Sequence, residues 1–264
     1  MMNKFFRNFT IFTLIVVIFV GCGSKIKKEI LDANEYFEYA KKLYDKGKYI
    51  DAITEFTVIV LKFSADPVVD DAQFYLAQSH FKNEEYLIAV AEYQKLITDY
   101  PESPYVEQAF YQIGLSYFEL SQRYELDQEY TLKALKQFQN LIEAYPEGAY
   151  RQNADERLND LRKKLAKKQL MGGNVYRKMG IFDSAIIYYD ILLEKYYDTP
   201  SAEEALYWKS VSLYKLKNYE DALTNFTVFL EKYPKSKYSG TVKSKISEIQ
   251  DRKLNAYNEG EVSN

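Results

Sequence analysis

The chain has 264 residues, is 47% apolar and carries a formal net charge of −3 at pH 7. Its 26 tyrosines and 16 phenylalanines, against only 10 glycines and 6 prolines, are typical of closely packed helices rather than loops or disorder. The mildly acidic charge argues against a nucleic-acid-binding protein, in which a basic surface is expected. With one cysteine and one histidine, the sequence offers neither a disulfide framework nor a multi-cysteine metal site.

Residues 1–21 have the pattern of a bacterial secretory signal peptide. Lys4 and Arg7 precede an apolar run of about 12 residues, and about 20 are needed to cross the hydrocarbon core of a membrane. The run ends at Phe19-Val20-Gly21-Cys22, which resembles a lipobox, the site at which bacterial lipoproteins are cleaved and acylated. Leucine is usual where Phe19 stands. The alternative interpretation is an uncleaved anchor helix with an incidental cysteine.

Cys22 is therefore the expected lipidation site, and acyl chains on it would hold the mature protein at a membrane. Gly23 follows the cysteine, so no aspartate signals retention at the inner membrane. By resemblance to such lipoproteins, the expected location is the outer membrane, with the chain facing the periplasm. Residues 22–32 are expected to form a short lipidated tether.

The rest of the sequence repeats a pair of helix-length amphipathic runs. Residues 70–103 show the unit, with two runs of about 14 residues separated by a polar break at 82–85 and ended by Tyr100-Pro101. The small residues Ala77 and Ala89 let the two helices approach closely. A helix pair of this length, which cannot bury its apolar face alone, is typical of a tetratricopeptide repeat.

An alanine in the second helix and an aromatic residue four positions later recur along the chain. The alanines are Ala52, Ala89, Ala134, Ala185 and Ala222, and the aromatic residues are Phe56, Tyr93, Phe138, Tyr189 and Phe226. Steps between the alanines are 37, 45, 51 and 37 residues, so the third and fourth repeats carry insertions. We therefore predict an all-α protein, an α-solenoid of about five tetratricopeptide repeats with a C-terminal capping helix.

The tetratricopeptide-repeat domain is expected over residues 33–257. Its repeats are expected at about 33–66, 67–103, 104–148, 149–199 and 200–236, followed by a cap at 237–257. Prolines at Asp66-Pro67, Ser103-Pro104 and Thr199-Pro200 are expected to open the first helices, each preceded by a capping side chain. The first helix of repeat four is expected to be long, from about 150 to 178, with Gly172-Gly173 permitting close packing.

No pattern in the sequence points to catalysis. His80 is expected to be a packing residue, since no cysteine or second histidine can share a metal with it. No glycine-rich phosphate loop or nucleophile elbow is present. The chain is therefore predicted not to be an enzyme and to use no cofactor and no metal.

Two aromatic series follow the repeat register of the first three repeats. The first aromatic series is Phe37, Phe74 and Tyr111, and the second aromatic series is Tyr44, Phe81 and Phe118, with 37 residues between successive members. In tetratricopeptide repeats these two positions usually face the concave side, so the six rings are expected to line a peptide-binding groove. The alternative is that the rings pack internally and seal the groove.

A basic run lies in the predicted long helix at residues 162–168. Its cations are Arg162, Lys163, Lys164, Lys167 and Lys168. One interpretation is the solvated face of the helix, and the other is a docking site for an acidic partner surface.

The sequence as a whole resembles the BamD family, the lipoproteins of the outer-membrane β-barrel assembly machinery. The resemblance rests on the cysteine after the leader, five repeats and a longer third repeat. It also rests on Tyr100-Pro101-Glu102-Ser103, on Asp127-Gln128 and on the helix at 155–168. Glu147-Gly148 and Tyr188 depart from the family, which tends to have a small polar pair and an arginine there.

This resemblance implies a non-enzymatic scaffold at the inner leaflet of the outer membrane. Its N-terminal groove would bind unfolded outer-membrane proteins, and its C-terminal half would dock on the barrel insertase BamA. No nucleic-acid partner is expected. The alternative is another tetratricopeptide-repeat lipoprotein, one that serves pilus assembly or cell-envelope coordination.

Overall fold

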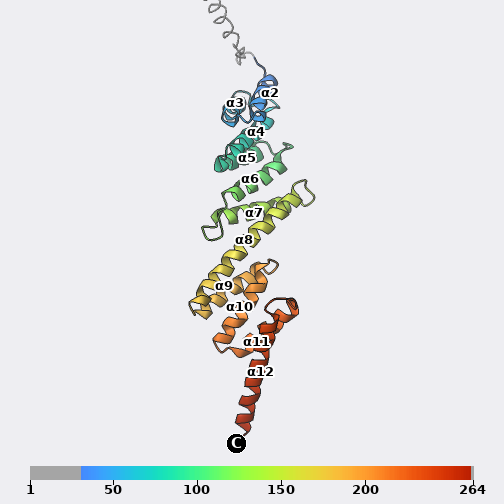
Figure 1. The fold of residues 1–264 in the computed structure, drawn as a ribbon. Coiled ribbons are helices and arrows are strands. Elements are labelled where there is room, and N and C mark those ends of the chain that lie inside the picture. The colour runs from blue at the N-terminus through green and yellow to red at the C-terminus, as the bar shows by residue number, and fades with distance from the viewer. Residues whose placement is uncertain (1–30, 263–264) are drawn as a thin grey trace, which may run out of the picture.

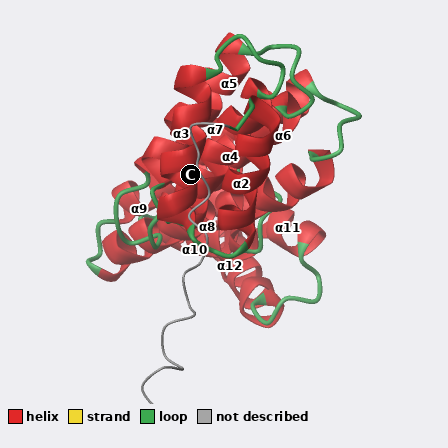
Figure 2. Cartoon of the chain, turned by 90° about the horizontal axis from the view of Figure 1, so that it is seen from above, coloured by secondary structure: helices red, strands yellow, loops and turns green. Residues whose placement is uncertain are grey.

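The computed structural model describes residues 31–262, and helices follow one another along an elongated stack (Figure 1). Seen from above, helices of successive repeats lie over one another (Figure 2). The helices are α2 (Ala33–Asp45), α3 (Tyr49–Lys62), α4 (Val69–Lys82), α5 (Tyr86–Asp99), α6 (Val106–Leu120), α7 (Glu129–Ala144), α8 (Arg151–Lys178), α9 (Phe182–Lys195), α10 (Ser201–Lys215), α11 (Tyr219–Lys232) and α12 (Ser239–Val262). Each packs mainly on its neighbours in the chain, which confirms the predicted α-solenoid.

The leader and Cys22 lie outside the described residues. Within residues 31–262, no helix is both long enough and apolar enough to cross a membrane. The capping helix α12 runs to Val262, five residues beyond its expected end at 257.

The repeated alanine and aromatic residues form the centre of the helix pairs. Ala89 and Tyr93 of α5 are fully buried, and the corresponding residues of the other four repeats are too. Burying one such ring contributes about 1.5–3 kcal/mol to the free energy of folding. This confirms the packing register that was inferred from the spacing of the alanines.

Gly172 and Gly173 allow α8 and α9 to approach closely, as predicted. A Cβ added at Gly173 would lie 2.5 Å from Cε1 of Tyr189, and one at Gly172 would lie 2.6 Å from Cε1 of Tyr188. The same closeness occurs in repeat three, where a Cβ at Gly114 would lie 2.6 Å from Cε1 of Phe138. Glycine is therefore required at these contacts despite its cost in a helix.

The first helices begin slightly later than the prolines predicted. Helix α4 begins at Val69 rather than Pro67, and α6 begins at Val106. The expected capping side chains instead close turns before the helices, since Oδ1 of Asp66 accepts from the Val68 N–H at 3.1 Å. Oγ of Ser103 accepts from the Tyr105 N–H at 3.3 Å in the same way. Pro67 and Pro104 therefore lie inside turns and not in the first helical turn.

Enlarging Ala89 should destabilise the stack, because the residue is fully buried where two helices touch. We expect Ala89→Leu to lower the free energy of unfolding by about 1–3 kcal/mol, measured by urea denaturation. Ala91, two residues further along α5, is exposed, so Ala91→Leu is the matched control and should change stability little. Equal effects of the two substitutions would contradict the packing described for this helix.

Candidate protein-binding surfaces

The first aromatic series lies in the core. Exposed fractions are 9% for Phe37, 3% for Phe74 and 9% for Tyr111. Tyr105 precedes α6 and stacks on Phe74 with ring centroids 4.3 Å apart, and Tyr150 before α8 stacks on Tyr111 at 5.1 Å. The expectation that these three rings line an accessible groove is therefore wrong. The reason, in repeats two and three, is that a tyrosine at the entrance to the next repeat covers the ring.

The second aromatic series remains partly exposed. Tyr44, Phe81 and Phe118 are neither fully buried nor fully solvated. Two of these rings meet the first residue of the following helix edge to face, Tyr44 with Tyr49 at 5.6 Å and Phe81 with Tyr86 at 5.4 Å. Partial burial, with the neighbouring Tyr49, raises the pKa of Tyr44 to about 12, so its hydroxyl stays neutral at physiological pH. The three rings form one discontinuous apolar row on the N-terminal repeats.

Repeat five reproduces both positions with tyrosines. Tyr207 is 7% exposed and stacks on Tyr238 with centroids 4.0 Å apart, as Phe74 stacks on Tyr105. Tyr214 is partly buried, and its hydroxyl donates to the carboxylate of Glu248 on α12. The division into a covered ring and a partly exposed ring therefore occurs in repeat five as well as in the first three repeats.

Three cations of the basic run bind other parts of the chain. The Arg162 guanidinium lies 2.6 Å from the Asp198 carboxylate, after α9. Nζ of Lys164 donates to Oγ of Ser121 at 2.7 Å, and Nζ of Lys168 donates to the Leu126 carbonyl at 2.8 Å. Both interpretations of the basic run are therefore corrected. The run is not simply a solvated helix face, and three of its five cations are not free to bind a partner protein.

The remaining two cations are less constrained. Lys163 lies 3.4 Å from the carboxylate of Asp160 one turn earlier, and Lys167 is exposed. Two cations of the basic run, Lys164 and Lys168, therefore hold the loop 121–128 between α6 and α7, and Arg162 holds the turn after α9. The sequence could not show that these three cations bind the chain itself and not a partner protein, because the groups they bind lie more than 30 residues away.

Gln128 organises the same loop from inside. Its side chain is 6% exposed, and Nε2 donates to the carbonyls of Arg123, Leu126 and Asp127 at 2.9–3.0 Å. Oε1 of Gln128 accepts from the Thr131 hydroxyl at 2.8 Å. All the groups named here are satisfied within the loop and the first turn of α7, which gives the inserted segment a fixed shape.

A hollow of about 290 Å³ lies where this loop meets α8 and α9. It is lined by Tyr124, Glu125, Lys168, Met171, Gly172, Val175 and Tyr188. Val175 is 54% exposed, and Met179, the residue that follows the end of α8, is 65% exposed. Ile187, beside Tyr188 in α9, is 60% exposed. Exposed apolar side chains around a hollow are typical of protein-binding surfaces. The spacing of Val175 and Met179 is the signal from which sequence reasoning could have found it.

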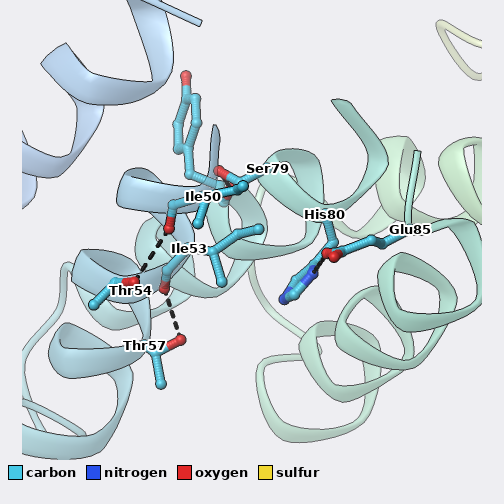
Figure 3. Close-up of polar contacts among 8 residues, drawn as sticks. Ile50, Ile53, Thr54, Thr57, Ser79, His80 and Glu85 are labelled. Carbon is cyan, nitrogen blue, oxygen red and sulfur yellow. Dashed lines mark hydrogen bonds and ion pairs between the residues drawn. The ribbon is translucent and has the colours of Figure 1, made fainter. Parts of the chain in front are cut away.

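The side chain of His80 has a local partner. Its Nδ1 lies 2.6 Å from Oε2 of Glu85, and Figure 3 shows the two side chains in contact. In the same view, the hydroxyls of Thr54 and Thr57 donate to carbonyls of their own helix. Across residues 31–262, no group of histidine, cysteine, aspartate and glutamate is arranged to hold a metal ion.

Removing the Lys164 ammonium should loosen the loop 121–128, because this group donates to both the carbonyl and the hydroxyl of Ser121. We expect Lys164→Ala to lower the free energy of unfolding by about 1 kcal/mol. Amide hydrogen exchange in the loop should become faster. Lys167→Ala is the control on the same helix and should leave exchange unchanged. Unchanged exchange in both variants would contradict the bracing role of Lys164.

Two family models match the chain. The model YfiO, described as outer membrane lipoprotein, matches residues 30–218, and a tetratricopeptide-repeat model matches residues 204–236. No curated protein matches the chain.

Similar solved structures include the TPR2AB domain of yeast Sti1 in complex with pHSP90. It is 15% identical, with 83% of each chain covered and a TM-score of 0.43. A tetratricopeptide repeat protein from Parabacteroides merdae is also 15% identical, with 82% of this chain and 72% of that chain covered and a TM-score of 0.36. A thermophilic tetratricopeptide-repeat protein from Thermus thermophilus is 18% identical, with 83% of this chain and 99% of that chain covered and a TM-score of 0.34.

Proposed function

The chain belongs to the outer membrane lipoprotein family, and from this we propose that it is the BamD-type scaffold of outer-membrane β-barrel assembly. The observation that carries the proposal is the family match over residues 30–218, which includes four complete helix pairs and the first helix of the fifth. The protein would act by binding other proteins and not by catalysis, as expected of an α-solenoid with extended binding surfaces.

Attachment to the membrane would use Cys22. Acylation of this cysteine would place residues 22–32 as a tether between the inner leaflet of the outer membrane and α2. Several acyl chains give stable anchoring, because each buried methylene contributes about 0.8 kcal/mol. The repeats would then face the periplasm.

Unfolded barrel precursors would bind at the second aromatic series. Such precursors end in strands with alternating aromatic side chains, and an extended segment can place these against Tyr44, Phe81 and Phe118 in turn. The support is that these three rings are partly exposed and recur at a constant step of 37 residues. The covered rings Phe37, Phe74 and Tyr111 would support the row from beneath.

The insertase BamA would dock on the C-terminal half, at the hollow beside Tyr188. Support comes from Val175, an exposed side chain that lines a hollow large enough for an apolar side chain. Met179 and Ile187, which lie close in sequence to the lining residues Val175 and Tyr188, are exposed as well. Binding there would bury apolar surface that a monomer usually hides.

Affinity purification from envelope extract should recover the barrel insertase. Met179→Asp should reduce this recovery at least tenfold, because it places a charge in the apolar contact, while the fold survives since Met179 is 65% exposed. Ile50→Asp is the matched control, because Ile50 is 68% exposed on the distant helix α3. Recovery of a pilus secretin in place of the insertase would support the alternative and overturn this proposal.

Removing the Phe81 ring should weaken the binding of a peptide from the C-terminal strand of a barrel precursor. Loss of about 1.4 kcal/mol from burial of one ring corresponds to a tenfold weaker affinity. The test is fluorescence anisotropy with Phe81→Ala, using circular dichroism to confirm the fold. Tyr197→Ala is the control, because this 66% exposed ring lies after α9. Unchanged affinity in folded Phe81→Ala would place the precursor site elsewhere.

A further inference from the structure

The first and last rings of the second aromatic series, Tyr44 and Phe118, each contact a side chain from a later helix. The contacting side chain is aromatic at Tyr44 and cationic at Phe118. Tyr75 lies edge to face with Tyr44 at 5.4 Å. At Phe118 the neighbour is a cation, because the guanidinium carbon of Arg157 on α8 lies 4.9 Å from the ring centroid. The ring that ends the N-terminal row is therefore flanked by positive charge.

A second cation reaches the same ring. Nζ of Lys164, two turns further along α8, lies 5.7 Å from the centroid of Phe118. Its hydrogen bonds go to the neutral carbonyl and hydroxyl of Ser121. Arg157 makes no ion pair or hydrogen bond with any residue that the structure describes. Two cations thus meet at one aromatic ring without a carboxylate, among the described residues, to balance them.

Two other cations of α8 are each balanced by a carboxylate. Arg151 lies 3.7 Å from Asp155, and Arg162 lies 2.6 Å from Asp198. In repeat five, the cation over the Tyr214 ring is Lys245, which pairs with Glu248 at 2.7 Å. Burial lowers the pKa of Lys164, as expected for a charge that lacks a counterion. The imbalance therefore distinguishes the surroundings of Phe118 from these sites and suits an anionic ligand.

We propose that Arg157 and Lys164, beside Phe118, bind the C-terminal carboxylate of an extended peptide. This inference rests on the proposed function and adds a direction to it. A guanidinium holds a carboxylate through two parallel hydrogen bonds, and the ammonium adds a second charge. The terminal apolar side chain of the peptide packs on the Phe118 ring.

We infer a terminal carboxylate, and not an acidic side chain, because the row of rings stops after Phe118. In repeat four the position equivalent to Phe118 is Arg177, whose guanidinium carbon lies 3.6 Å from the Trp208 ring centroid. An apolar segment that follows Tyr44, Phe81 and Phe118 therefore meets no further ring of this series in repeat four. Its own C-terminus supplies a negative charge at that point without an acidic side chain in the segment.

The test compares one fluorescent peptide from the C-terminal strand of a barrel precursor as free acid and as C-terminal amide. With the full-length protein in detergent, the free acid should bind about tenfold more tightly than the amide. Arg157→Gln should abolish this preference, and Arg157→Lys should retain part of it. Arg151→Gln, on the same helix, should keep it in full. Equal affinity of acid and amide for the unmodified protein would overturn the inference and point to contacts along the peptide alone.

A small probe separates the carboxylate site from the proposed function. N-acetyl-phenylalanine carries only a ring and a carboxylate, and its binding can be followed by isothermal titration against its amide. Binding that requires Arg157 supports the site even if no strand peptide binds, an outcome that would count against precursor binding. Strand binding without acid preference, or no difference between probe and amide, would leave the precursor surface standing and reject the carboxylate site.

Discussion

In repeats two, three and four, an aromatic ring of the second helix packs close to a small residue of the first helix. A Cβ at Gly114 or Gly173 would overlap the ring of Phe138 or Tyr189, and in repeat two Ala77 occupies the core cluster that contains Tyr93. Because this contact leaves no spare volume, the distance between the two helices of a pair and their rotation about their own axes are both fixed. The regular stacking of the surface rings depends on this constraint.

The inserted segment of repeat three changes how the two halves are joined. A loop of this length would lack internal support, yet Gln128 satisfies its carbonyls from within, and Lys164 and Lys168 hold it from α8. Much of the positive charge of the long helix therefore contacts the chain itself. Beside the loop, the exposed side chain of Val175 lines a hollow together with Tyr188, so apolar surface is available there for a protein contact.

Accessibility of the aromatic rings follows from the turns between repeats. Tyr105, Tyr150 and Tyr238 each precede a first helix and stack on a ring of the preceding repeat, so these rings join the core. The second aromatic series is covered only in part, by Tyr75 at one end of the N-terminal row and by Arg157 at the other. A row of partly exposed rings that ends beside two cations without a carboxylate suits an apolar segment with one terminal negative charge.

The sequence by itself determined the helices, their order and the buried alanine and aromatic contacts. These features repeat locally, with a helical period inside each run and a step near 37 residues between several of the runs, so they can be read without coordinates. Only the tertiary structure decided which aromatic series is covered, because the covering tyrosine comes from a turn that lies outside the amphipathic runs. It also decided which cations of α8 are paired, since Asp198 and Ser121 lie 36 and 43 residues away from Arg162 and Lys164. Pairing over such distances depends on how the repeats stack, and residue spacing along one helix does not encode it.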